Sequence, residues 1–188
     1  MTINLVPIAT LTGRVVTRWS GTEMALAEGR EDRGVCWEDS SVPFLQFTHL
    51  DLQVGTGQVL RLLSQIDDGS VHHGFYLEEL HEPSALRVSD DPSSIFRDRT
   101  LTELPLGEVE IVELRLDGPS AIVEMRLASS GSEIRLVAAE VYEEHDGSLR
   151  IVECDESILI QLNGERPPRP AGESVFGDEL GRSAFRGR

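Results

Sequence analysis

The sequence contains no lysine, although it has 17 basic residues, all of which are arginine. A chain without lysine cannot supply the lysine of a phosphate-binding P-loop, a Schiff-base lysine or the lysine of a protein kinase. A glycine-rich phosphate loop is also lacking, since Gly55-Thr56-Gly57 joins two predicted strands and not a strand to a helix. These lysine-dependent sites and the dinucleotide fold are therefore excluded.

Aromatic residues are scarce, at 5%, and basic patches with interleaved aromatics are absent. The 33 acidic residues leave a formal net charge of −16, which repels nucleic acid and anionic membranes. No apolar run approaches the roughly 18 residues of a membrane span. The N-terminus, Met1–Ala9, lacks the basic start and apolar core of a signal peptide. We therefore expect a cytoplasmic protein that binds neither nucleic acid nor membranes.

Only two cysteines occur, Cys36 and Cys154, and they form neither a zinc-binding spacing nor a C-x-x-C motif. In a reducing cytoplasm both are expected to be free thiols. Cys36 lies in an apolar run typical of a buried structural thiol. Cys154 stands between Glu153 and Asp155, whose negative charges are expected to raise its pKa and lower its reactivity. The sequence thus predicts no catalytic residue, no metal and no cofactor.

Alternation of apolar and polar residues dominates the second half of the chain, which predicts β-strands joined by short turns. Five strands in a meander are expected there: 109–116, 123–127, 134–138, 149–153 and 157–162. Two adjacent apolar residues, Ile111 and Val112, break the alternation of the first of these strands. They predict either a β-bulge or a strand that is buried on both faces.

The first half of the chain shows the same pattern. Three strands are expected at 47–54, 59–66 and 71–80, after one long strand or two over 6–19 with a bend at Gly13. The fold class is therefore mainly β, with antiparallel meander sheets arranged as a sandwich or a partly open barrel. A single domain over 1–162 is expected. The strand patterns of 45–80 and 109–162 resemble each other, and the alternatives are a pseudo-repeat or a pattern common to all β-hairpins.

Helix is predicted only in short pieces. Residues 91–98 begin with an acidic cap followed by proline, which is typical of a helix start. Residues 23–31 are a second candidate, interrupted by Gly29. The last segment, 163–188, is rich in proline and glycine and is predicted to be a flexible tail. It has five arginines and four acidic residues, so the negative charge belongs to 1–162.

Seven acidic residues gather between positions 140 and 156, around Tyr142 and His145, with only Arg150 to offset them. If the strands on either side are adjacent, their turn end carries an acidic patch with an aromatic anchor. Such a patch suits a basic protein partner, or it is a solvated face. The predicted partner-binding residues are Glu140, Tyr142, Glu143, Glu144, His145, Asp146, Glu153, Asp155 and Glu156.

An alternative site lies in the histidine-rich stretch that begins with His72 and His73. The two occupy opposite faces of a predicted strand, and Glu78 lies too far from His72, roughly 20 Å along the strand, to share an ion with it. We therefore interpret these residues as surface or half-buried histidines. The alternative is an enzymatic or metal-dependent site near His72 or His73 in the mouth of a barrel.

The leading hypothesis is a non-enzymatic binding module that holds a basic protein through the acidic patch. In its general character (small, acidic, strand-rich, without a catalytic motif) the chain is similar to bacterial immunity and antitoxin proteins, although this similarity is one of composition alone. The rival hypotheses are an enzyme or metal-dependent protein with a site at His72 and His73, and a subunit of a larger assembly tethered by the tail. The oligomeric state is left open.

Overall fold

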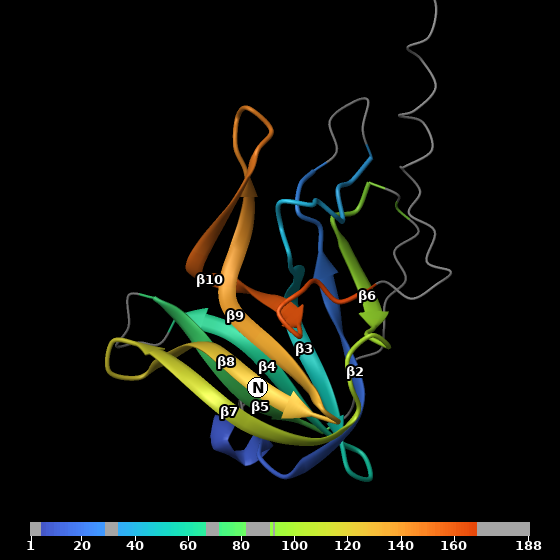
Figure 1. Ribbon diagram of the computed structural model, residues 1–188, viewed down its shortest axis with the longest axis vertical. Helices are drawn as coiled ribbons and strands as arrows, with labels where there is room; N and C mark the ends of the chain where they lie inside the picture. The colour runs from blue at the N-terminus through green and yellow to red at the C-terminus, as the bar shows by residue number, and fades with distance from the viewer. Residues whose placement is uncertain (1–4, 29–33, 67–71, 82–90, 92, 169–188) are drawn as a thin grey trace, which may run out of the picture.

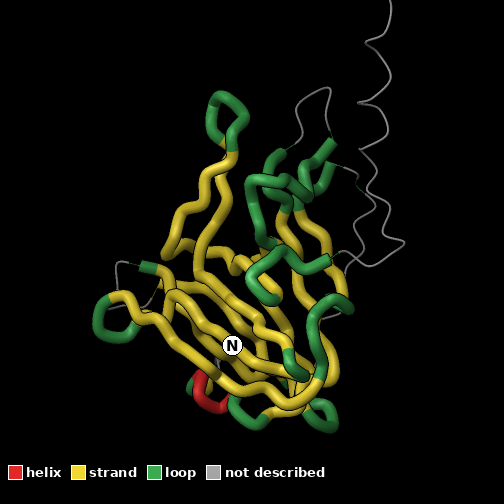
Figure 2. The backbone as a smooth tube through the Cα atoms, in the orientation of Figure 1, coloured by secondary structure: helices red, strands yellow, loops and turns green. Residues whose placement is uncertain are grey.

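The computed structural model describes residues 5–28, 34–66, 72–81, 91 and 93–168. They form one antiparallel sheet of ten strands and a 3-10 helix at Ile8–Leu11 (Figure 1, Figure 2). The strands are β1 (Leu5–Val6), β2 (Arg14–Met24), β3 (Leu45–Val54), β4 (Gln58–Ile66), β5 (His73–Leu80), β6 (Phe96–Thr100), β7 (Gly107–Asp117), β8 (Ala121–Ser129), β9 (Ser132–Glu143) and β10 (Leu149–Leu162). The prediction of a mainly β fold with antiparallel meanders is confirmed.

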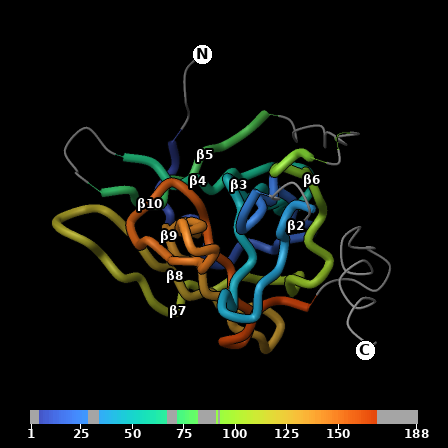
Figure 3. The backbone as a smooth tube through the Cα atoms, turned by 90° about the horizontal axis from the view of Figure 1, so that it is seen from above, coloured from blue at the N-terminus to red at the C-terminus, as the bar shows by residue number. Residues whose placement is uncertain are grey.

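The strands follow the order β1-β5-β4-β3-β10-β9-β8-β7-β2-β6, and β2 also pairs with β3. Because of this second pairing, the strands from β3 through β10, β9, β8 and β7 to β2 form a closed circuit. Two strands pair with the edge of β3 that faces away from β2. Residues 45–47 of β3 pair with β10, and residues 49–54 pair with β4. The sheet therefore curls around one of its own faces, as in a partly open barrel (Figure 3).

Apolar side chains from alternate strand positions fill the inside of the curled sheet. Trp19 and Phe47 are the largest of the fully buried side chains, and the Trp19 indole N–H donates a hydrogen bond to the carbonyl of Pro105. A second, smaller apolar cluster, which includes Val137 and Leu159, packs on the other face of β9 and β10. The middle parts of these two strands are thus buried on both faces of the sheet.

The stretch 109–162, where five strands were predicted, contains four strands, β7 to β10. The predicted strands 149–153 and 157–162 are parts of one strand, β10, which stays paired with β9 on both sides of an interruption. The interruption has the polar composition of a turn, which is why the sequence pattern suggested two strands. The predicted irregularity near Ile111 is a bulge, because the pairing of β7 with β8 shifts between Ile111 and Glu113.

The helix prediction for 91–98 is wrong. The Asp91 carboxylate accepts hydrogen bonds from the backbone N–H and the hydroxyl of Ser93, which forms a local turn, and the chain then enters β6. An acidic residue before proline favours such a turn as well as a helix start, and pairing with β2 decides in favour of the strand. Of the second candidate, 23–31, the first two residues end β2, and its last three lie outside the described residues.

At the N-terminus the predicted strand 6–19 is divided by the 3-10 helix and by Gly13, whose φ of 79° makes the expected bend. At the other end a turn at Asn163-Gly164 follows β10. Most of the predicted tail, 163–188, lies outside the described residues. The single domain over 1–162 and the pseudo-repeat stay predictions.

Candidate functional site

A bulge in β10 organises the candidate site. The pairing steps from Glu153 to Ile158 while β9 advances by a single residue, so residues 154–157 have no place in the register. Within the bulge, Cys154 has a φ of 59°, a left-handed conformation that residues other than glycine adopt uncommonly. On the turn side of the bulge, β9 and β10 project past the rest of the sheet as a hairpin (Figure 1).

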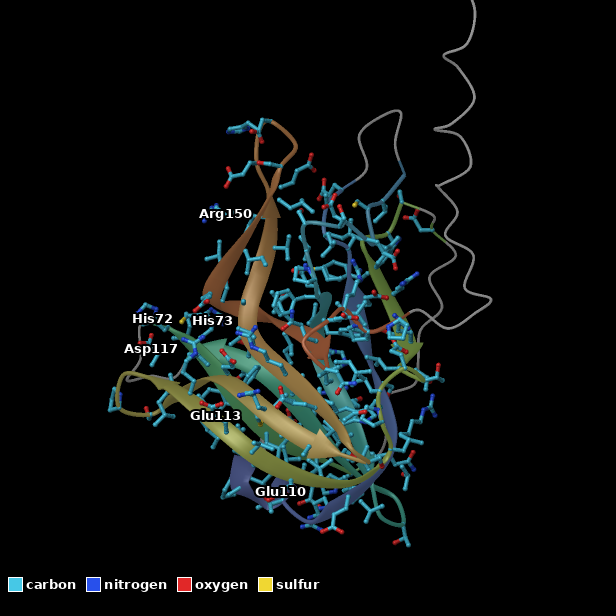
Figure 4. The ribbon with its side chains drawn as sticks, in the orientation of Figure 1. His72, His73, Glu110, Glu113, Asp117 and Arg150 are labelled. Atoms are coloured by element: carbon cyan, nitrogen blue, oxygen red, sulfur yellow. The ribbon has the colours of Figure 1, made fainter. Side chains whose placement is uncertain are left out.

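Three side chains from different strands converge beside the bulge: His72 just before β5, Asp117 at the end of β7, and Cys154. The Asp117 Oδ2 atom lies 3.6 Å from Nε2 of His72 and 3.7 Å from Sγ of Cys154. The three ligand atoms all lie within 4.8 Å of one another, and Figure 4 shows His72 and Asp117 side by side at the edge of the molecule. We call these residues the bulge cluster.

The electrostatics of the bulge cluster keep its thiol neutral. Burial raises the pKa of Cys154, and the Asp117 carboxylate raises it further by its charge and by accepting a hydrogen bond from the thiol. The sequence had pointed to Glu153 and Asp155 as the cause, but Glu153 is the weakest contributor. A nucleophilic cysteine needs a base such as histidine as its direct neighbour. Here the carboxylate of Asp117 takes that position, so the cluster is not arranged as a nucleophile with its base.

Gly74 allows His72 to reach the cluster. A Cβ atom at Gly74 would lie 3.1 Å from Cβ of Ala121 and 3.2 Å from the backbone nitrogen of Ile122. These are tighter than ordinary contacts, so a larger residue would push β5 away from the start of β8. The absence of a side chain at this position therefore brings the beginning of β5 close to the β7–β8 turn.

Buried polar groups lie behind the bulge. Glu140 on β9 is 9% exposed and accepts a hydrogen bond of 2.9 Å from the hydroxyl of Ser157. Burial raises the pKa of Glu140, as do the charges of Glu156 and Asp155, whereas Ser157 and His73 act to lower it. The buried Nδ1 atom of His73 has no hydrogen-bond partner among the described residues. Glu140 and His73 thus form an inner polar layer and not an exposed surface.

Tyr142 stands at the base of the projecting hairpin. Its side chain is 39% exposed, and its hydroxyl donates a hydrogen bond of 3.1 Å to Asp155 in the bulge. Burial raises the pKa of Tyr142 to about 12, with Glu140 and Asp155 as further causes. The hydroxyl therefore stays protonated at neutral pH and can donate this hydrogen bond from the hairpin to the bulge.

Arginine side chains offset part of the hairpin's negative charge. Glu144 pairs with Arg150, and Glu153 pairs with Arg115 at 3.1 Å. We call five of the exposed side chains of the hairpin the hairpin patch: Tyr142, Glu143, His145, Asp146 and Ile151.

The structure distributes the predicted partner-binding residues over the hairpin, the buried layer and the bulge, with Glu153 as the last paired residue of β10 before the bulge. Tyr142 and residues 143–146 belong to the hairpin, whereas Glu140 is buried and Asp155 and Glu156 lie in the bulge. The two predicted histidines also separate, since His72 joins the bulge cluster and His73 lies close enough to Glu140 to influence its pKa.

Sequence reasoning did not associate Asp117 and Cys154 with His72. The three residues are far apart in the chain, and the ladder from β7 through β8 and β9 to β10 carries Asp117 to Cys154. The loss of alternation at residues 154–157 was a usable signal, because a polar interruption between two apolar runs fits a bulge as well as a turn.

No family model, curated protein or solved structure matches this chain. Within the part of the chain that the structure describes, no helix is long and apolar enough to cross a membrane. The function is therefore argued from the chemistry and geometry of the residues themselves.

Proposed function

We propose that the protein binds a basic protein partner through the hairpin patch. The observation that carries this proposal is an acidic hairpin that projects past the sheet (Figure 1). It exposes two large apolar side chains, Tyr142 on the face that it shares with its partner Arg150 and Ile151 on the opposite face. Binding energy at protein interfaces concentrates in a few anchors such as tyrosine. Surrounding charges of one sign select a partner of the opposite sign.

The charge of the whole chain supports the same kind of partner. A net charge of −16 attracts basic proteins over a distance and raises the rate of encounter at low ionic strength. Between positions 140 and 156, Arg150 is the one basic residue against seven acidic ones. A role like that of bacterial immunity proteins, with a basic toxin as the partner, belongs to this proposal.

The tip of the hairpin is ordered before any partner arrives. The Asp146 carboxylate accepts hydrogen bonds from the backbone N–H and the hydroxyl of Ser148, at 2.9 and 2.6 Å. The backbone N–H of Gly147 donates to the carbonyl of Glu144, which closes the turn. A preformed surface loses little conformational entropy on binding, so more of the contact energy appears as affinity.

The test is capture from an extract of the organism that makes the protein, at low ionic strength, with immobilised wild-type protein and two charge variants. Glu143→Arg reverses a charge in the hairpin patch. Glu110→Arg is the matched control, because it changes the net charge equally at an exposed position of β7 at the other end of the molecule (Figure 4). A basic protein should be retained by wild type and Glu110→Arg, and lost with Glu143→Arg or at high salt.

The retained protein, once purified, allows a quantitative second step. Tyr142→Ala should weaken its binding by about 2 kcal/mol, roughly thirtyfold, since the tyrosine is the aromatic anchor of the patch. Equal retention by the two charge variants, or no basic protein retained by wild type, would contradict the proposal.

A further inference from the structure

We propose that the bulge cluster of His72, Asp117 and Cys154 is a binding site for a divalent transition-metal ion of the zinc class. None of these residues belongs to the hairpin patch, so the site stands independently of partner binding. It rests on the convergence of an imidazole, a carboxylate and a thiol from three separate strands.

Two of the three distances between the ligand atoms are close to those of a tetrahedral zinc site. Zinc bonds of about 2.0–2.3 Å to nitrogen, oxygen and sulfur place neighbouring ligand atoms about 3.4–3.6 Å apart. The Asp117 oxygen lies 3.6 Å from the His72 nitrogen and 3.7 Å from the Cys154 sulfur. The imidazole and the thiol lie within 4.8 Å of each other. Small side-chain movements therefore complete the coordination without moving the strands.

The kinds of ligand indicate which ions the site prefers. Thiolate and imidazole select zinc and similar transition metals over magnesium and calcium, which prefer oxygen ligands. Three protein ligands leave the fourth tetrahedral position to water or to another molecule. The side chains of His72 and Asp117 are 52% and 41% exposed, so an ion can enter directly from solvent.

The charges around the cluster also favour a cation. Besides Asp117, the acidic residues Glu153, Asp155 and Glu156 are neighbours of Cys154 in the chain. Arg115 contacts Glu153 and supplies part of the compensating positive charge. A bound divalent ion would offset part of this negative charge, including that of the thiolate which the ion itself would bind.

Two backbone features place the ligands, and each has a cost in stability. The left-handed conformation of Cys154 is unfavourable relative to an ordinary one. Glycine at position 74 makes the strand less stable than a larger residue would, but it permits the close approach of β5 to β8. Unfavourable conformations of this kind gather at functional sites, where the arrangement of side chains compensates for them.

Cobalt binding tests the thiol ligand, with Cys36 as the matched control. Cys36 is also a half-buried free cysteine, but its thiol faces the carbonyl of Glu38 at 3.3 Å and lies outside the cluster. Chelator-treated, reduced protein is titrated with Co²⁺, which shows a near-ultraviolet charge-transfer band when a thiolate binds it. The band should appear with one ion per chain in wild type and Cys36→Ser, disappear in Cys154→Ser, and bleach when Zn²⁺ displaces the cobalt.

Zinc titration by calorimetry tests the other two ligands. His72→Gln and Asp117→Asn should each weaken zinc binding by about tenfold or more, since even residues outside the coordination shell contribute that much at zinc sites. His145→Gln, which changes an exposed histidine on the hairpin, should bind zinc as wild type does. Thermal melting without metal identifies any variant that fails to fold.

Either of two results would overturn the site. One is a cobalt–thiolate band that survives in Cys154→Ser or is lost in Cys36→Ser. The other is the same zinc affinity in His72→Gln as in His145→Gln. Because these measurements use purified protein and metal alone, their failure leaves the proposal of a basic protein partner untouched.

Discussion

The hairpin patch and the bulge cluster each include one residue of β10, Ile151 and Cys154, but they are built in different ways. The patch comes from one continuous stretch, 142–151, shaped by a local turn. The cluster takes one residue each from the start of β5, the end of β7 and the bulge of β10, so it depends on the register of several strands. A site of the first kind tolerates changes elsewhere in the sheet, whereas a site of the second kind is lost when any supporting strand moves.

Replacing Gly74 is expected to have the largest effect, because it should impair the bulge cluster and leave the hairpin patch intact. In Gly74→Val the added side chain meets Ala121 and Ile122, so we expect a loss of about 3 kcal/mol in the free energy of unfolding and a loss of zinc binding. Urea denaturation and zinc titration measure both effects, and capture of the basic partner should be unchanged.

The second variant Ala121→Gly provides the control for this prediction. It removes one of the atoms that a side chain at position 74 would meet, so combined with Gly74→Val it should recover part of the lost stability. A Gly74→Val protein as stable as wild type would show that β5 and β8 do not approach closely at this point.

Removing the hydroxyl of Ser157 should have the next largest effect. Ser157→Ala leaves the buried Glu140 carboxylate without its hydrogen bond, and we expect the free energy of unfolding to fall by about 1–2 kcal/mol. Ser148→Ala is the comparison on the exposed hairpin turn, where water can replace the hydroxyl and the loss should be smaller. Equal losses, measured by urea denaturation, would mean that the layer behind the bulge is not effectively buried.

The raised pKa of Glu140 predicts a smaller, pH-dependent difference in stability between wild type and Glu140→Gln. Because burial raises this pKa in the folded protein, the fold favours the protonated carboxyl, and wild type loses stability as the pH rises from the ordinary carboxyl range through the raised value. Glu140→Gln has no such loss. It should therefore melt at a higher temperature than wild type near neutral pH and at a similar temperature in acid.

The exposed Glu143 on the hairpin offers the matched control, since Glu143→Gln removes an equal charge without burial. Melting curves of the three proteins across the acid and neutral range make the comparison. If Glu140→Gln were the less stable protein at neutral pH, the carboxylate would be favourably paired in the fold and the predicted sign would be wrong.

The smallest effect is expected at the hydroxyl of Tyr142. Tyr142→Phe loses one exposed hydrogen bond to Asp155, so the free energy of unfolding should change by less than about 0.5 kcal/mol. The aromatic ring stays in place, and partner binding should fall far less than in Tyr142→Ala. A large loss of stability would indicate that this hydrogen bond holds the hairpin onto the bulge.

Patterns confined to a short stretch were predicted well. The alternation around the turn at Ser130-Gly131 identified the hairpin of β8 and β9. Two adjacent apolar residues at Ile111 and Val112 predicted either a bulge or a strand buried on both faces, and the structure has the bulge. Both signals arise from neighbouring side chains that face opposite sides of one strand.

Features decided by distant pairing were missed. Asp91 before proline was interpreted as a helix cap, but pairing with β2 made the following residues a strand. Residues 154–156 were interpreted as a break between two strands, because the sequence alone does not show that β9 accompanies both halves of β10. The convergence of Asp117 and Cys154 depends on that same pairing, so the cluster became visible only in the structure.

The central claim is that the hairpin patch and the bulge cluster are two independent sites, and capture of the basic partner by Asp117→Asn and Glu143→Arg tests it most directly. Each variant removes negative charge close to β10, in the bulge cluster and in the hairpin patch respectively. Measured side by side in the presence of a chelator, Asp117→Asn should retain the partner as wild type does, and Glu143→Arg should not. Loss of the partner in both variants, or its retention in both, would contradict the account.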